Sequence, residues 1–189
     1  MKNFFLTLVI CIFAVVHTSA QEPVFRKSDN VVSLGVGIGG TLYSGLVYTG
    51  NSINRTPTIS LGFEHCIIDN LFDDKSAIGV GGAFGYASAQ YNYGGWGWKS
   101  TDFMIGVRGA FHYALVDKLD TYAGIVMGYN INNWKWTGAG WTNSSTTGSS
   151  GLTSAVFVGG RYYVADVLAV FAEIGYGYTI VNAGIALKF

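Results

Sequence analysis

A two-residue alternation of apolar side chains with small or polar ones recurs along this chain. It is clearest in the last ten residues, where Asn182, Gly184, Ala186 and Lys188 separate the apolar Val181, Ala183, Ile185, Leu187 and Phe189. Successive side chains of a β-strand point to opposite faces, so this period predicts a strand with one apolar and one polar or crowded face. In a soluble protein the open edge of such a strand invites aggregation. A closed membrane barrel has no open edge, so the pattern favours a β-barrel.

The composition points the same way. Half of the residues are hydrophobic and only 12% are charged, against about 25% charged in soluble domains. No stretch after the first twenty residues approaches about 18 continuous apolar residues, which argues against spanning helices. High apolarity without such a helix is typical of alternating, lipid-facing strands. The formal net charge of zero argues against nucleic acid as a partner.

The amino-terminal segment has the features of a targeting sequence. Lys2 gives a positive start, Phe4 to Val16 are apolar, and Thr18-Ser19-Ala20 supplies small residues before Gln21. We therefore expect residues 1–20 to be a signal peptide that is cleaved after Ala20. The alternative is a membrane anchor, but the apolar core of about 13 residues is shorter than the roughly 20 that a spanning helix needs. Residues 21–29 are polar and without period, which predicts a short leader.

The remaining residues, 30–189, form the expected barrel domain. Eight alternating segments predict eight strands, at 30–40, 58–68, 77–90, 101–114, 120–133, 151–163, 168–178 and 181–189. Each is close to the roughly 9–11 residues that a tilted strand needs to cross a bilayer. The connections alternate between short turns (69–76, 115–119, 164–167) and longer segments rich in Gly, Asn, Ser and Thr (41–57, 91–100, 134–150). In bacterial barrels short turns are periplasmic and long loops extracellular. The expected fold is an all-β, eight-stranded antiparallel up-and-down transmembrane barrel.

One family resemblance rests on the stretch from Gly175 to Phe189, which reads GYGYTIVNAGIALKF. It resembles the closing strands of the outer-membrane β-barrel domain family, the small OmpA/OmpW-like proteins of Bacteroidetes-type bacteria. The pattern covers the whole mature chain, but specific residues match only at the carboxyl end. The resemblance implies a place in the bacterial outer membrane, in contact with its lipid. It also implies that Ile185, Leu187 and Phe189 form a signal for the barrel assembly machinery.

Charged side chains on the inward faces are the first candidate site. These residues are Glu64, Asp102, Arg108, His112, Arg161 and Glu173. The interior of an eight-stranded barrel is just wide enough for side chains, and an unpaired buried ion costs several kcal/mol. We expect pairs that plug the lumen, with Arg161 facing Glu173 across a hairpin centred on Val167, and Arg108 reaching Glu64. The alternative is a narrow path for ions or small solutes, lined by the same charges.

The tryptophans are the second candidate site, because all five fall in two expected outer loops: Trp96, Trp98, Trp134, Trp136 and Trp141. The favoured interpretation is an aromatic girdle at the membrane interface. The alternative is a surface patch for sugars or a host protein, formed by flat rings on Gly-, Ser- and Asn-rich loops. Trp141 fits a girdle least well.

Enzymatic and cofactor-dependent functions have little support in the sequence. Some eight-stranded outer-membrane barrels are lipid A deacylases or acyltransferases that use His, Ser and an acid. Here His65 is expected to face lipid and His112 to face inward with no serine in register, so a triad is not expected. No metal-ligand spacing or phosphate-binding loop predicts a cofactor. A soluble lipocalin-like barrel is the fold alternative, but charges are too few to solubilise its outer face. We therefore expect a barrel with a structural or surface-interaction role.

The expected assembly signal can be tested by deleting Phe189. Loss of the terminal aromatic side chain should lower the yield of barrel folded in the outer membrane, while export to the periplasm stays intact. The measurement is the fraction of heat-modifiable protein in outer-membrane preparations. A normal folding yield without Phe189 would count against the signal.

Overall fold

The computed structural model describes residues 24–40, 53–93, 96–138, 145–147 and 150–189, and this part of the chain is antiparallel β-structure. Its strands are β1 (Asn30–Ile38), β2 (Ile53–Arg55), β3 (Thr58–Asp69), β4 (Ser76–Tyr93), β5 (Trp96–Val116), β6 (Leu119–Gly138), β7 (Ser145–Thr147), β8 (Gly151–Tyr163), β9 (Leu168–Tyr176) and β10 (Val181–Lys188). No helix in the described ranges is long and apolar enough to cross a membrane. The expected signal peptide, residues 1–20, lies outside the described residues.

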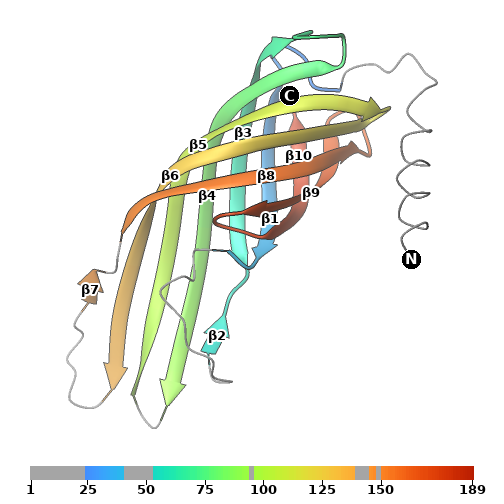
Figure 1. The fold of residues 1–189 in the computed structure, drawn as a ribbon. Helices are drawn as coiled ribbons and strands as arrows, with labels where there is room; N and C mark the ends of the chain where they lie inside the picture. Colours follow the sequence, from blue (N-terminus) through green and yellow to red (C-terminus); the bar gives the residue numbers. More distant parts are fainter. Residues whose placement is uncertain (1–23, 41–52, 94–95, 139–144, 148–149) are drawn as a thin grey trace, which may run out of the picture.

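A ring of eight strands forms the body of the molecule (Figure 1). In order they are β1, β3, β4, β5, β6, β8, β9 and β10. The ring closes because β10 pairs with β1 in a register that runs from Val31 opposite Lys188 to Ile38 opposite Val181. Closure pairs the edge that a half-apolar terminal strand would otherwise expose. The expected all-β, eight-stranded up-and-down barrel is confirmed.

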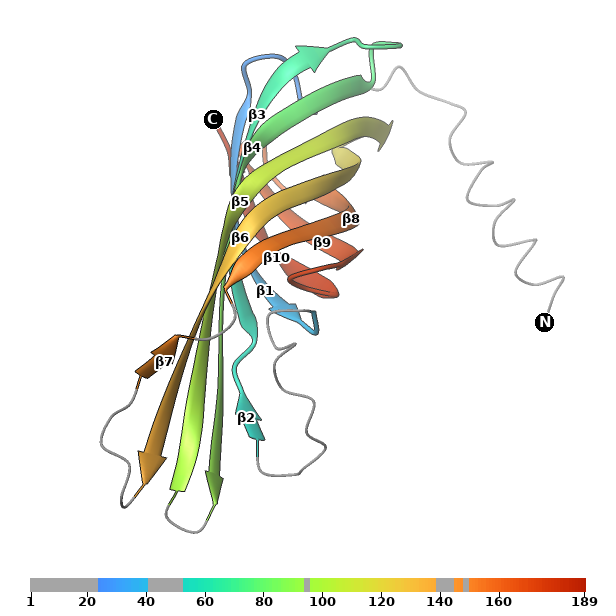
Figure 2. The same ribbon diagram turned by 60° about the vertical axis from the view of Figure 1, so that its left-hand side comes forward.

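Three neighbouring strands, β4, β5 and β6, run well past the ring on one side. Figures 1 and 2 show them projecting together, with the short strands β2 and β7 beside them. The prediction of loops at 91–100 and from residue 134 was therefore wrong, since Tyr91 stays opposite Trp98 and Trp98 opposite Trp136. The Gly and Asn content suggested loops. Aromatic side chains at alternate positions instead stabilise cross-strand pairs, and they extend the sheet.

The outward face of the ring is an apolar belt. On β5 the outward Ile105 and Val107 are 62% and 67% exposed, while the inward Met104, next to Ile105 in the strand, is fully buried. Along β5 the belt runs from Phe103 to Tyr113. At about 3.4 Å per residue and a strand tilt near 40°, this distance corresponds to a band roughly 25 Å high. That height matches the lipid-facing band of outer-membrane barrels.

The inside of the ring is packed solid in layers. One apolar layer lies near the short turns and contains Phe25, Val31, Cys66, Ala77, Tyr163, Ala169, Phe171 and Ala186. A second lies further along the axis and contains Ala83, Ala87, Met104, Ala110, Tyr122, Val126, Ala155, Phe157 and Tyr178. Phe25 belongs to the expected leader, yet it is only 3% exposed. The leader therefore closes the end of the barrel at the short turns, which its polar sequence did not indicate.

Candidate functional site

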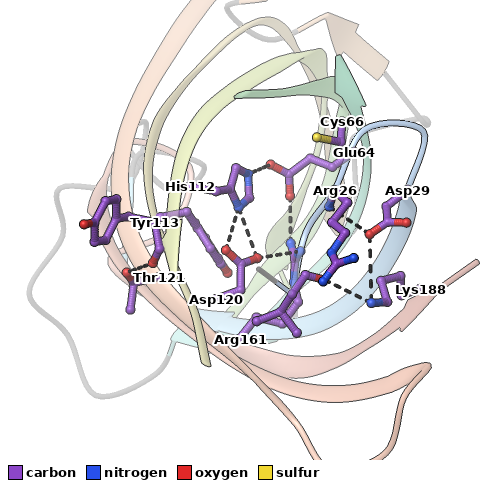
Figure 3. Close-up of polar contacts among 12 residues, drawn as sticks. Arg26, Asp29, Glu64, Cys66, His112, Tyr113, Asp120, Thr121, Arg161 and Lys188 are labelled. Carbon is purple, nitrogen blue, oxygen red and sulfur yellow. Dashed lines mark hydrogen bonds and ion pairs between the residues drawn. The ribbon is translucent and has the colours of Figure 1, made fainter. Parts of the chain in front are cut away.

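Glu64 is the meeting point of the charged groups inside the barrel. Strand β3 turns it inward, where Arg161 Nη2 donates to its Oε2 at 2.7 Å and His112 Nε2 lies 3.0 Å from its Oε1. Arg108 Nε lies 3.6 Å from the same Oε1, an ion pair that is too long for a hydrogen bond. The close-up in Figure 3 shows Glu64, His112 and Arg161 converging from separate strands. One carboxylate therefore ties β3, β5 and β8 together.

Asp120 forms the other half of this arrangement. Its Oδ2 accepts a hydrogen bond from Arg161 Nη1 at 3.2 Å, and its Oδ1 lies 2.9 Å from His112 Nδ1 (Figure 3). Both ring nitrogens of His112 thus face carboxylate oxygens, which accept but do not donate when ionised. To make both bonds the ring must carry two N–H groups, which is the imidazolium form. Neither nitrogen is then available to activate a nucleophile.

Glu173 and Arg108 extend the arrangement across the lumen. Arg108 Nη2 donates to Glu173 Oε1 at 2.8 Å, and Tyr122 Oη donates to the same oxygen at 3.0 Å. Asn182 Nδ2 donates to Glu173 Oε2 at 3.2 Å. The Arg108 guanidinium carbon also lies 3.9 Å from the centre of the Phe157 ring, a favourable cation–π geometry. Arg108 is therefore held both by its hydrogen bond to Glu173 and by its contact with the Phe157 ring.

We refer to seven of these residues as the lumen network: Glu64, Arg108, His112, Asp120, Tyr122, Arg161 and Glu173. All are buried. Their three carboxylates face two guanidinium groups and one imidazolium, so the charges balance. Glycines make room for them: a Cβ at Gly79 would lie 3.0 Å from Phe25 Cε1 and 3.1 Å from His112 Nε2. The result is a cross-section filled by paired side chains.

Most residues of the lumen network were expected from the sequence, but the expected pairing was partly wrong. Arg108 and Glu64 lie close, as expected, but the predicted pair of Arg161 with Glu173 is wrong. Arg161 stands opposite Phe171, and Glu173 opposite Gly159. The hairpin is symmetric about residue 166 instead of 167, and this shift of one residue in the centre moves the partner by two positions. Arg161 binds Glu64 and Asp120 instead.

Two acidic residues depart from expectation in opposite ways. Asp102 was expected in the charged group, but it lies further along the axis and binds neutral partners: Ser100 Oγ, Asn130 Nδ2 and Asn132 Nδ2, at 3.2, 3.2 and 2.7 Å. Asp120 was missed because it stands at the start of a strand, beside a turn. Tyr122 was assigned to the inner face, and Asp120 lies two residues before it on the same strand. Asp120 must therefore face inward as well, and this was the signal that could have identified it.

The tryptophans lie on a different face from the one favoured by the sequence analysis. Trp98 and Trp136 face each other across β5 and β6, and Trp134 faces the buried Ser100. Strand alternation therefore puts all three on the face that continues the lumen lining, so the lipid-side girdle was wrong for them. Trp96 lies within β5, but its side chain is outside the description, as is the whole of Trp141.

These rings form one cluster, which we call the aromatic face: Tyr91, Trp98, Trp134 and Trp136. The ring centres of Tyr91 and Trp98 are 6.1 Å apart in a stacked arrangement, and those of Trp98 and Trp134 are 4.8 Å apart. Trp98 and Trp134 are partly exposed, and Trp136 is 38% exposed. Directly along the strands from them lie Asp102, Asn130 and Asn132.

The residues expected to form the assembly signal lie on the outer surface. Ile185 and Leu187 are half exposed on β10, and Phe189 follows at its end. The backbone N–H groups of Asn30 and Phe189 each donate to the carbonyl of the other residue at 2.9 Å. An accessible apolar row on the closing strand suits recognition during assembly, and that role stays a prediction. Among the described residues, no cluster of three or more His, Cys, Asp or Glu side chains could hold a metal ion.

Comparisons with known proteins define the fold. No protein-family model matches the chain, and no curated protein does. Among solved structures, the attachment invasion locus protein Ail of Yersinia pestis, in complex with the heparin analogue sucrose octasulfate, is similar with a TM-score of 0.51 at 12% identity, over 87% of this chain and 100% of Ail. The N-terminal β-barrel domain of Pseudomonas aeruginosa OprF gives a TM-score of 0.46 at 9% identity, over 86% and 98%. OprG from the same organism gives 0.40 at 11% identity, over 89% and 99%.

The expected fold, that of a small outer-membrane β-barrel, is thus confirmed. The exposed apolar belt is the surface that such a barrel turns toward lipid. Belt and fold together place the chain in a bacterial outer membrane as an integral β-barrel.

Replacing Glu64 tests whether the lumen network holds the barrel together. Glu64→Gln removes the carboxylate shared by Arg108, His112 and Arg161, and it should lower the free energy of unfolding by roughly 3–5 kcal/mol, the cost of an uncompensated buried charge. The measurement is urea-induced unfolding of protein refolded into lipid vesicles.

Asp102→Asn is the matched control, since it removes one buried carboxylate whose partners are all neutral. It should cost about 1 kcal/mol, the scale of a single hydrogen bond. Equal losses for the two variants would contradict a special role for Glu64.

Proposed function

We propose that this protein is a closed outer-membrane barrel that serves as a surface receptor for carbohydrate, bound at the aromatic face. The observation that carries the proposal is the position of three tryptophans on the lumen side of the projecting strands, above a floor of buried amides. Flat aromatic rings offer apolar contact to the C–H faces of sugar rings, and they do so at low cost in conformational entropy.

Unused acceptors beside the aromatic face support a ligand rich in hydroxyl groups. Asn130 Oδ1 and Asn132 Oδ1 are buried and have no hydrogen-bond partner within the described chain. Buried polar atoms are nearly always paired, and a specific exception needs a partner from elsewhere. Both oxygens have essentially no exposed surface, so a sugar hydroxyl would supply one after the side chains above them move aside. Both amides already donate to Asp102, so their oxygens are held in fixed positions.

The frame that carries the aromatic face is a continuous, paired sheet. Strands β4 and β5 stay paired as far as Tyr93 opposite Trp96, and β6 accompanies them as far as Gly138 opposite Trp96. Binding residues on a continuous sheet are ordered before the ligand arrives, so less entropy is lost on binding than with residues on loops. The long strands thus provide a preorganised platform outside the membrane.

A narrow channel is the alternative function, and the lumen network argues against it. Each of its ions is already paired with side chains, and Phe25 packs on His112 with 4.4 Å between the ring centres. A solute would have to break several of these buried contacts in order to pass. The closed interior therefore favours a role at the surface.

Glycan binding by the refolded barrel tests the proposal. We expect a subset of neutral oligosaccharides on a glycan array to bind the wild-type protein. Titration of those sugars should change tryptophan fluorescence. The double substitution Trp98→Ala and Trp134→Ala should weaken binding by at least tenfold, given about 1 kcal/mol or more for each lost aromatic contact.

The double substitution Trp98→Phe and Trp134→Phe is the control, because it keeps a ring at both positions and should retain part of the affinity. Heat-dependent gel mobility checks that each variant is folded. If no glycan on the array binds the folded wild-type barrel, the carbohydrate assignment is wrong.

A further inference from the structure

Two lysines face each other on the outer surface of the projecting strands. Lys99 of β5 and Lys135 of β6 are direct cross-strand partners, and both are exposed. They alternate with the tryptophans, so they point away from the aromatic face. Like charges directly opposite in a sheet are destabilising. In the described part of the chain no carboxylate lies within ion-pair distance of either ammonium group, so nothing there offsets the repulsion.

The surface around this pair is hollowed and supplies further hydrogen-bond donors. A shallow depression is lined by Lys99, Thr101, Phe103, Asn133 and Lys135. Thr101 stands opposite Asn133 in the ladder, one step toward the membrane from the lysines on the same face. The hydroxyl of Thr101 and the amide of Asn133 can both donate to an anion. Two ammonium groups with two neutral donors form a cradle for a group with several acceptor oxygens.

The height of the depression relative to the apolar belt identifies the compartment. Phe103 opposite Ile131 is the last apolar pair of the belt, and Lys99 opposite Lys135 comes four residues further along the strands. At about 3.4 Å per residue and a tilt near 40°, the lysines lie roughly 10 Å above the belt edge. Their backbone thus lies just beyond the headgroup region, which adds about 5–8 Å on each side of the hydrocarbon core. The flexible lysine side chains can reach down into that region.

The distribution of charge along the chain favours an anionic partner on this side. Beyond Asp102 on this side, the described ranges 53–57, 88–93, 96–101 and 132–138 contain Arg55, Lys99 and Lys135 but no Asp or Glu. The short turns at the opposite end (69–76, 115–119 and 164–167) contain five aspartates and two lysines. The projecting strands beyond Asp102 therefore carry basic groups and no acidic ones, whereas the short-turn end carries both, with Arg26, Lys27 and Lys188 beside its aspartates. Attraction to anionic lipid depends on such clustered basic residues near the membrane surface.

We propose that Lys99 and Lys135 bind a phosphate group on the headgroup of an outer-leaflet glycolipid of the lipid A type. The two ammonium groups flank the phosphate, and Thr101 and Asn133 donate to its remaining oxygens. Lysine binds phosphate as a point charge, and a phosphate between two lysines removes their mutual repulsion. Phe103 and Ile131 lie below, where the first methylene groups of an acyl chain would pack. This site is on the opposite face of the sheet from the aromatic face, so it is independent of the proposed carbohydrate site.

Native mass spectrometry of the refolded barrel in detergent tests the proposal. The probes are lipid A carrying its phosphates and the same lipid after removal of the phosphates. The wild type should bind the phosphorylated form more tightly. The double substitution Lys99→Gln and Lys135→Gln should reduce that preference about thirty-fold, the product of two lysine–phosphate interactions at a membrane surface. Lys99→Arg with Lys135→Arg should keep most of it.

The double substitution Lys75→Gln and Lys118→Gln is the matched control, because it removes the same charge at the short turns. This control should leave lipid binding unchanged. If it lost the preference for the phosphorylated lipid to the same extent, the effect would come from net charge alone, and the proposal would be overturned. Undiminished preference for the phosphorylated lipid in the Lys99 and Lys135 double variant would overturn it as well. Displacement of the lipid by an equal concentration of inorganic phosphate would assign the site to a free anion instead.

Discussion

The balance of charge around Glu64 is the constraint on which the rest of this structure depends. A lumen that contains two arginines and a protonated histidine must supply carboxylates at matching positions, because an uncompensated buried ion costs several kcal/mol. Glu64 forms ion pairs with Arg161, His112 and Arg108, and Asp120 and Glu173 supply the other two carboxylates. These residues come from five different strands, so their contacts fix how the strands are placed around the ring. Small inward side chains, as at Gly79, are a condition for this packing.

A filled lumen leaves function to the surfaces, and the two-residue alternation divides these surfaces sharply. Beyond the belt, β5 and β6 present Trp98 and Trp134 on one face and Lys99 and Lys135 on the other. The first face adjoins buried amides with unused oxygens, which suits a polyhydroxylated ligand. The second adjoins the lipid headgroups, which suits a phosphate. The same extended sheet can therefore contact lipid headgroups with its outer face and bind a soluble ligand with its inner face.

The fold was predictable from sequence because alternation and strand length are local properties, and the closing strand from Val181 showed both. Inward orientation of Arg108, Arg161 and Glu173 followed from the same period. Partners across the lumen could not be derived in this way, since they depend on hairpin centres: one residue of difference, 166 instead of 167, redirected Arg161 from Glu173 to Glu64 and Asp120. The extent of β5 and β6 was also missed, because the glycines and asparagines near Trp98 and Trp134 imitate loops. The burial of Phe25 carried no periodic signal at all.

The central claim is that the lumen is closed by its own side chains, and planar-bilayer conductance of the refolded barrel measures this most directly. Only protein whose gel mobility shifts on boiling should be used, so that silence cannot arise from misfolding. The account predicts no unitary current steps from the wild type. It also predicts steps from a barrel in which Phe25 and Arg108 are both replaced by alanine. Those changes remove the Phe25 side chain that closes the short-turn end and the Arg108–Glu173 contact across the lumen. Reproducible steps from the folded wild type that change with Arg108→Ala would contradict the closed lumen and establish a pore lined by these charges.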